Sequence, residues 1–154
     1  MPTDAGRLTP RERAALGNLC DRVDCERVRI HRDPGDRLRA AVLLLSGGRA
    51  VTLGNHVFLP DAADDLALLA HELTHCGQYQ GWGTLVYYGR GVRDRVRDVL
   101  YLAGFGESPY RYVVDGRPFD AYDMEQQGQI VEDCFNGDTA ARAISPYRPA
   151  DRST

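Results

Sequence analysis

The sequence lacks any long hydrophobic run. Its longest apolar stretch, residues 40–45, is far too short to span a bilayer. Residues 1–13 are polar and lack the apolar centre of a signal peptide. We therefore expect a soluble protein with no membrane partner, either cytoplasmic or exported by a specialised secretion route.

A concentrated basic surface and a dense set of cysteines are also missing. The formal net charge is -3, and arginines alternate with aspartates within residues 93–98, which is typical of a solvated helix face. No nucleic-acid partner is expected. The cysteines Cys20, Cys25, Cys76 and Cys134 lack zinc-finger spacing. Cys20 and Cys25 are close enough in sequence to bridge, but we expect free buried thiols in a reducing compartment.

The chain length limits the number of domains. With 154 residues, 43% of them hydrophobic, the chain can build one substantial core but hardly two. It has no internal repeats and no low-complexity tract. We predict a single domain over residues 1–154, with a core at about 9–144 and a flexible tail at 145–154.

An H-E-x-x-H motif, formed by His71, Glu72 and His75, is the most informative feature that is present. It lies within residues 64–80, which are predicted to form one amphipathic helix. Two histidines four residues apart share a helical face and can bind one Zn²⁺. Glu72 is one step around the helix, where it can act as a base towards a water molecule at the metal.

The setting of the motif favours metal binding over chance. Leu66, Leu69, Leu73 and Cys76 recur at helical spacing and predict a buried stripe beside the histidines. Cys76 is therefore interpreted as a core residue and not as a ligand. The alternative is that both histidines are ordinary residues paired with nearby carboxylates.

Local patterns predict several more elements. Helices are expected over residues 9–20, 33–45, 85–102 (with a break at 89–91) and 120–135, and strands over 28–31, 50–53 and 56–59. The last of these helices begins at Asp120 or Asp123. A short β-sheet combined with several helices indicates an α+β fold.

A catalytic zinc site needs a third protein ligand, and the helix over residues 120–135 offers two candidates. Glu125 and Glu132 are two turns apart, about 10.5 Å along the helix axis, so one ion cannot bind both. We choose Glu125, because Gly128 one turn later lets this helix approach the motif helix closely. Glu132 is kept as the reserve, and either could be an ordinary solvated glutamate.

Four segments carry a resemblance to known zinc peptidases: residues 29–31, 50–58, 68–78 and 125–128. The chain resembles the gluzincins, in particular the minimal gluzincins and, most closely, the bacterial metallopeptidase domain of unknown function associated with extracellular contractile injection systems. This resemblance implies a small zincin-like fold. It also implies His71, His75 and Glu125 as zinc ligands and Glu72 as the base.

The chain departs from the gluzincin pattern at one position. Many gluzincins carry an aspartate four residues after the ligand glutamate, whereas this sequence has Gln129. An amide brings no negative charge to a ligand histidine, so weaker zinc binding or lower activity is expected.

Three tyrosines and two further histidines could also contribute to the site. Tyr110, Tyr112 and Tyr122 lie in sequence between the two ligand helices, and a phenol there can stabilise an oxyanion. We predict this catalytic role for Tyr122, which lies one turn before Glu125. His31 and His56 are left out of the metal site as ordinary strand residues.

The leading functional hypothesis is a zinc metalloendopeptidase in which Glu72 is the general base and the substrate is a peptide or protein. In gluzincins an edge strand pairs with the substrate, which suggests that role for residues 50–53 or 56–59. The alternative is an inactive or weakly active zinc-binding interaction or cargo module of an injection system or toxin-like assembly. A metal-free helical domain would require an accidental motif.

Overall fold

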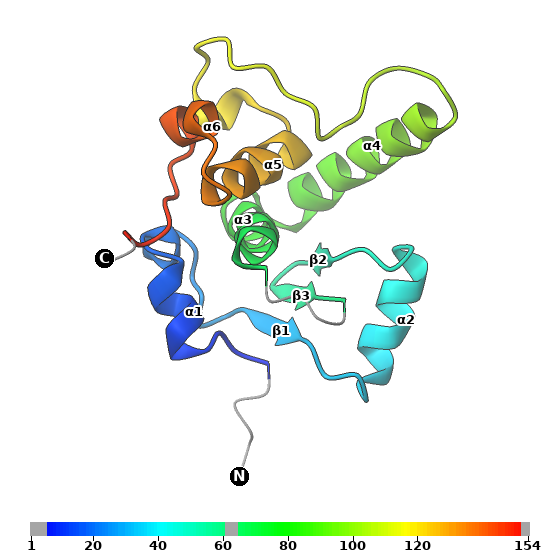
Figure 1. Ribbon diagram of the computed structural model, residues 1–154. Coiled ribbons are helices and arrows are strands. Elements are labelled where there is room, and N and C mark those ends of the chain that lie inside the picture. Colours follow the sequence, from blue (N-terminus) through cyan, green and yellow to red (C-terminus); the bar gives the residue numbers. More distant parts are fainter. Residues whose placement is uncertain (1–5, 61–64, 152–154) are drawn as a thin grey trace.

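The computed structural model describes residues 6–60 and 65–151 and has the expected α+β architecture. A long central helix, α3 (Leu66–Trp82), lies between a three-stranded sheet on one side and the helices α5 (Met124–Phe135) and α6 (Thr139–Ile144) on the other (Figure 1). The helix α4 (Thr84–Leu102) projects away from this body. Helix α3 is therefore in contact with most of the fold.

The sheet is small and mixed. Its strands are β1 (Arg29–His31), β2 (Val51–Leu53) and β3 (His56–Phe58), in the order β1-β3-β2. Strand β3 runs parallel to β1 and antiparallel to β2, and Gly54, at a φ of 64°, allows the tight turn between β2 and β3. Strand β2 is consequently an edge strand.

The core forms where α3 packs against the sheet and α5. Fully or almost fully buried side chains come from every layer: Leu69, Leu73 and Cys76 of α3, Ile30 and Val57 of the sheet, and Val131 of α5. Cys76 is thus a core residue, as its position on the apolar stripe predicted. The buried stripe fixes which side of α3 carries His71 and His75 towards α5.

Two predicted helices differ from the observed ones. No break occurs at residues 89–91, and α4 is continuous over Thr84–Leu102. The first helix, α1 (Pro10–Ala15), ends earlier than predicted, and a 3₁₀ turn, η1 (Leu19–Asp21), follows. The cause is Gly17, which has a φ of 60° and leaves the helical path.

Two other helix boundaries depend on capping aspartates. Helix α2 (Arg37–Leu45) begins after Asp36, whose carboxylate accepts hydrogen bonds from two backbone N–H groups of the first turn. The prediction had placed this start at residue 33. A second 3₁₀ turn, η2 (Phe119–Ala121), precedes α5, and Asp123 forms a capping box at the start of α5. Of the two predicted caps, Asp123 is the correct one.

Residues 145–151, within the predicted tail, dock beside α1. The Asn18 side chain donates to the Pro146 carbonyl and accepts from the Arg148 N–H at 2.8 Å. A Cβ added at Gly17 would collide with the Arg148 carbonyl. Residues 152–154 lie outside the described part of the chain. The proline-rich polar sequence of this segment gave no sign of these contacts.

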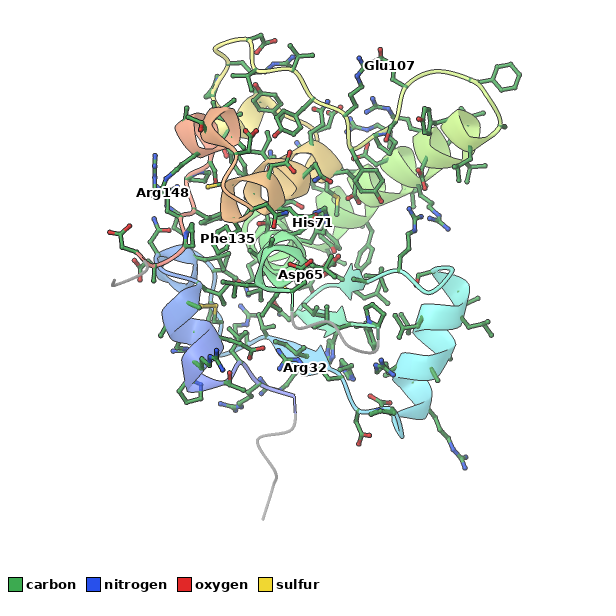
Figure 2. The ribbon with its side chains drawn as sticks, in the orientation of Figure 1. Arg32, Asp65, His71, Glu107, Phe135 and Arg148 are labelled. Carbon is green, nitrogen blue, oxygen red and sulfur yellow. A yellow bond between two sulfur atoms is a disulfide. The ribbon has the colours of Figure 1, made fainter. Side chains whose placement is uncertain are left out.

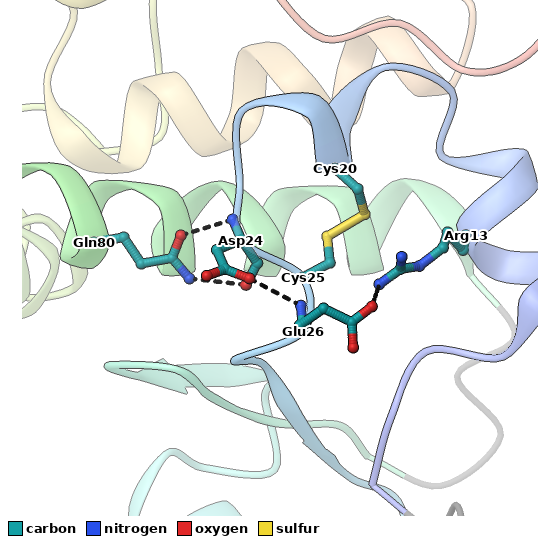
Figure 3. Close-up of a disulfide and its surroundings, with 6 residues drawn as sticks. All are labelled: Arg13, Cys20, Asp24, Cys25, Glu26 and Gln80. Atoms are coloured by element: carbon teal, nitrogen blue, oxygen red, sulfur yellow. Dashed lines mark hydrogen bonds and ion pairs between the residues drawn. A yellow bond between two sulfur atoms is a disulfide. The ribbon is translucent and has the colours of Figure 1, made fainter.

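Cys20 and Cys25 form a disulfide, so the expectation of free thiols is wrong for this pair, whereas Cys76 and Cys134 are free and buried. The disulfide closes a short loop that contacts the end of α3. The Gln80 side chain accepts from the Asp24 N–H at 2.9 Å and donates to the Asp24 carbonyl (Figure 3). The bridge thereby anchors the last turn of the central helix.

Of the helices within the described ranges 6–60 and 65–151, none combines the length and the apolarity that crossing a bilayer requires.

Replacing both Cys20 and Cys25 with serine should lower the free energy of unfolding by about 2 kcal/mol, the loop-closure value for so short a loop. Denaturant titration measures this loss. Reduced wild-type protein is the matched control and should resemble the double variant. Equal stability of oxidised and reduced wild type would contradict a structural role for the bridge.

Candidate metal centre

Three potential ligand atoms converge between α3 and α5, where Figure 2 places His71. The Nε2 atoms of His71 and His75 lie 3.6 Å and 3.3 Å from Oε2 of Glu125. One donor atom from each residue lies within 4.8 Å of the others, and both histidines are buried. Nitrogen and carboxylate donors of this number suit a divalent transition metal such as zinc.

Each histidine is held in place through its other ring nitrogen. Nδ1 of His71 donates to Glu132 Oε2 at 2.8 Å, and Nδ1 of His75 donates to Gln78 Oε1 at 2.7 Å. Gln78 is fixed in turn by donating to the Met124 carbonyl and to Gln127. Because each Nδ1 donates in this way, the neutral form of each ring has its Nε2 lone pair directed at the centre.

Glu132, the alternative ligand in the sequence, therefore has a different role. Its carboxylate supports His71 from behind and brings the negative charge that was expected to be missing from this site. Gln129 does not replace it, because the Gln129 amide donates to Asp133. A carboxylate behind His71 is thus supplied seven residues after Glu125, not at the position four residues after it that the resemblance implied.

The close approach of the two helices depends on Gly128. A Cβ added at this position would lie 2.7 Å from Nε2 of His71 and 2.9 Å from its Cδ2 atom. The His71 ring therefore packs directly against the backbone of α5. A side chain at position 128 would have to displace the ring.

Glu72 is buried and anchored from the sheet. The Thr52 hydroxyl lies 2.7 Å from Glu72 Oε2 and 3.1 Å from the Glu72 backbone carbonyl. The Tyr87 hydroxyl donates to the Thr52 carbonyl at 2.9 Å, which ties this part of β2 to α4. The pattern of the sequence gave no reason to choose Thr52, because its role arises from the way β2 packs on α3.

Carboxylates and imidazoles in the centre change one another's protonation. Burial lowers the pKa of His71, but its hydrogen bonds to Glu125 and Glu132 and nearby negative charges outweigh this and raise that pKa to about 10. The same competition raises the pKa of His75. Burial opposes ionisation of Glu125, but the two histidines lower its pKa. Metal binding must therefore compete with protons for the histidines.

A cleft of about 750 Å³ opens onto the centre between α2, β2 and α4. His71, Glu72, His75 and Glu125 lie on its floor or wall, and most of the remaining lining is apolar. The apolar lining includes Val42, Leu45, Val51, Leu53, Tyr88 and Val92. A space of this size can hold several side chains of an extended ligand.

Tyr122 does not line this cleft, and its predicted role needs correction. Its ring is buried in a separate cluster with Ile130 and Cys134, and its hydroxyl donates to the Val113 carbonyl. Tyr110 lines the cleft instead, with its ring centroid 6.4 Å from that of His71. Burial and the charge of Glu125 raise the pKa of Tyr110, so its phenol keeps a proton to donate. The choice by helical spacing failed because Tyr122 precedes α5 in extended backbone.

Residues 8–83 match the family model of the eCIS core domain, which associates this segment with extracellular contractile injection systems. The matched segment is just under half of the chain and includes His71, Glu72 and His75. Glu125 and Glu132 lie beyond it. No curated protein and no solved structure gives a significant match to this chain.

Gly128→Ala should weaken binding of Zn²⁺ by at least about tenfold, the scale seen when the support of a ligand histidine is disturbed. Alanine favours helices over glycine by about 1 kcal/mol, so α5 itself should remain folded. Zinc affinity can be measured by competition with a chelating dye. Gly89→Ala in α4, where an added Cβ has open space, is the matched control. Wild-type zinc affinity in Gly128→Ala would show that metal binding does not depend on the close packing of His71 against position 128.

In metal-free protein the free energy of unfolding should fall as the pH rises from 6.5 towards 10. Folded His71 holds its proton up to about pH 10, whereas the ordinary pKa is 6.5, so the folded state binds more protons in this window. Denaturant titration in the presence of a chelator measures the slope. His71→Asn should reduce it, and an unchanged slope in that variant would assign the effect to other groups.

Proposed function

We propose that this protein is a zinc-dependent metallopeptidase in which His71, His75 and Glu125 hold the metal and Glu72 is the general base. The observation that carries the proposal is the convergence of three donor atoms in a cleft that Glu72 also lines. Bound zinc would acidify a water molecule and polarise a peptide carbonyl.

The roles of the side chains follow from their contacts. Glu72 Oε2 accepts from Thr52, which leaves Oε1 to take the proton of the attacking water and to return it to the leaving amine. Glu132 and Gln78 keep the two histidines in position. The Tyr110 phenol is the proposed donor to the oxyanion that develops on the carbonyl.

The cleft favours an extended peptide with apolar side chains as the substrate. Its walls come from α2 and α4, whose lining residues Leu45 and Val92 are exposed to solvent. The Thr52 carbonyl on the edge strand already accepts from Tyr87. Continuous strand pairing along β2 would have to share the Thr52 carbonyl with Tyr87, so we propose that the walls contribute most of the binding.

A second candidate function is a zinc-binding interaction or cargo module without turnover. The match to the eCIS core domain supports it, because such a domain can serve an injection-system assembly without hydrolysing anything. Both candidates require the metal. They differ in whether Glu72 acts as a general base.

Glu72→Gln should bind zinc as wild type does and should lower the rate of peptide hydrolysis by at least about 100-fold, the usual scale for losing a general base. Zinc content is measured by elemental mass spectrometry and cleavage by digestion of a mixed peptide library. Glu107→Gln, on an exposed loop well away from His71 (Figure 2), is the matched control. Full activity in Glu72→Gln would refute the mechanism.

If the wild type binds zinc and a chelator lowers its stability, yet no peptide in the library is cleaved, the module is favoured over the peptidase.

A further inference from the structure

The two histidines outside the metal centre form a pair of their own. Nε2 of His31, on β1, lies 3.0 Å from Nδ1 of His56, on β3. In the parallel register His31 is opposite Phe58, and His56 is opposite Arg29, so the two histidines are diagonal neighbours. All four histidines of the chain are therefore arranged in two pairs.

The two pairs lie on opposite sides of the sheet. Side chains alternate along a strand, and the buried Ile30 and Val57 occupy the face that packs towards α3. Thr52, directly across from Val57, reaches Glu72 from that same face. His31 and His56 project from the other face, so their pair is separate from the metal centre described above.

His31 has the support that is typical of a metal-binding histidine. Its Nδ1 donates to Asp36 Oδ2 at 2.8 Å, which puts the proton on Nδ1 and leaves the Nε2 lone pair facing His56. Asp36 cannot move freely, because its Oδ1 accepts from the N–H groups of Leu38 and Arg39 at the start of α2. The His31 ring also stacks on Phe58, with centroids 4.3 Å apart.

We propose that His31 and His56 bind a second divalent transition-metal ion, with Nε2 of His31 and Nδ1 of His56 as its two protein ligands. In the metal-free pair Nδ1 of His56 donates to Nε2 of His31, so the ion takes the place of that proton and the neutral His56 ring carries its proton on Nε2 instead. In a tetrahedral zinc site two nitrogen ligands are roughly 3.4 Å apart, so the observed pair needs to open by only a few tenths of an ångström. Imidazole pairs suit Zn²⁺, Cu²⁺ and Ni²⁺. Since His56 is exposed, solvent can fill the remaining coordination positions.

Charges around the pair are compatible with this role. The Asp36 carboxylate supplies negative charge directly behind His31. The charge of Arg29 acts on His56, and the Arg29 guanidinium donates to the Glu26 and Val28 carbonyls. Burial and the charges of His31 and Arg29 lower the pKa of His56, which keeps its ring neutral and able to bind a metal.

The test is a zinc titration of ¹⁵N-labelled full-length protein, followed by long-range ¹H–¹⁵N NMR of the four imidazole rings. Two events are expected: His71 and His75 respond first, and Nε2 of His31 and Nδ1 of His56 respond at higher zinc. His56→Asn should abolish only the second event. His71→Asn should abolish the first event and leave the second, which separates this proposal from the proposed peptidase centre.

Asp36→Asn is a second, milder variant. Asparagine caps a helix as well as aspartate does, so α2 should remain folded. Loss of the carboxylate behind His31 should weaken the second event by about 10- to 100-fold. The proposal is overturned if the His31 and His56 rings do not respond to excess zinc, or if His31 responds equally in His56→Asn.

Discussion

The close packing of α3 against α5 is the constraint on which the site depends. His71 lies against the bare backbone of Gly128, and only this approach lets one helix present carboxylates to both nitrogens of the same ring. Glu125 and Glu132 are two turns apart on α5, and His71 lies between them. The two glutamates are therefore not alternatives: Glu125 faces Nε2 of His71, and Glu132 accepts from Nδ1 of the same ring.

Much of this centre could be predicted from the sequence, because helical periodicity alone determines which residues share a face. The position of α3, the burial of Cys76 and the shared face of His71 and His75 follow from that regularity. The choice of Glu125 as the third residue rested on Gly128 and on the resemblance to gluzincins, and Glu125 does converge with the two histidines. The support by Glu132 could not be predicted, because it depends on the angle at which two helices cross. Tyr110 was missed for a related reason, since loop backbone carries no periodicity.

Local sequence also failed where distant segments meet. The disulfide, the docking of residues 145–151 beside Gly17 and the anchoring of Glu72 by Thr52 all join parts of the chain through tertiary contacts. The proposed metal site has the same character. Its three donors come from two segments, and residues 8–83, which match the eCIS core domain, contain two of those donors, His71 and His75. The segment that follows must fold onto α3 before the ligand set is complete.

Strand β2 both lines the cleft and holds the Glu72 side chain. Val51 and Leu53 form part of the cleft wall, while Thr52 between them holds the Glu72 carboxylate on the opposite face of the same three-residue strand. Any displacement of this wall would therefore also move the hydroxyl that positions Glu72. The shape of the cleft and the alignment of the carboxylate are thus set by one short strand.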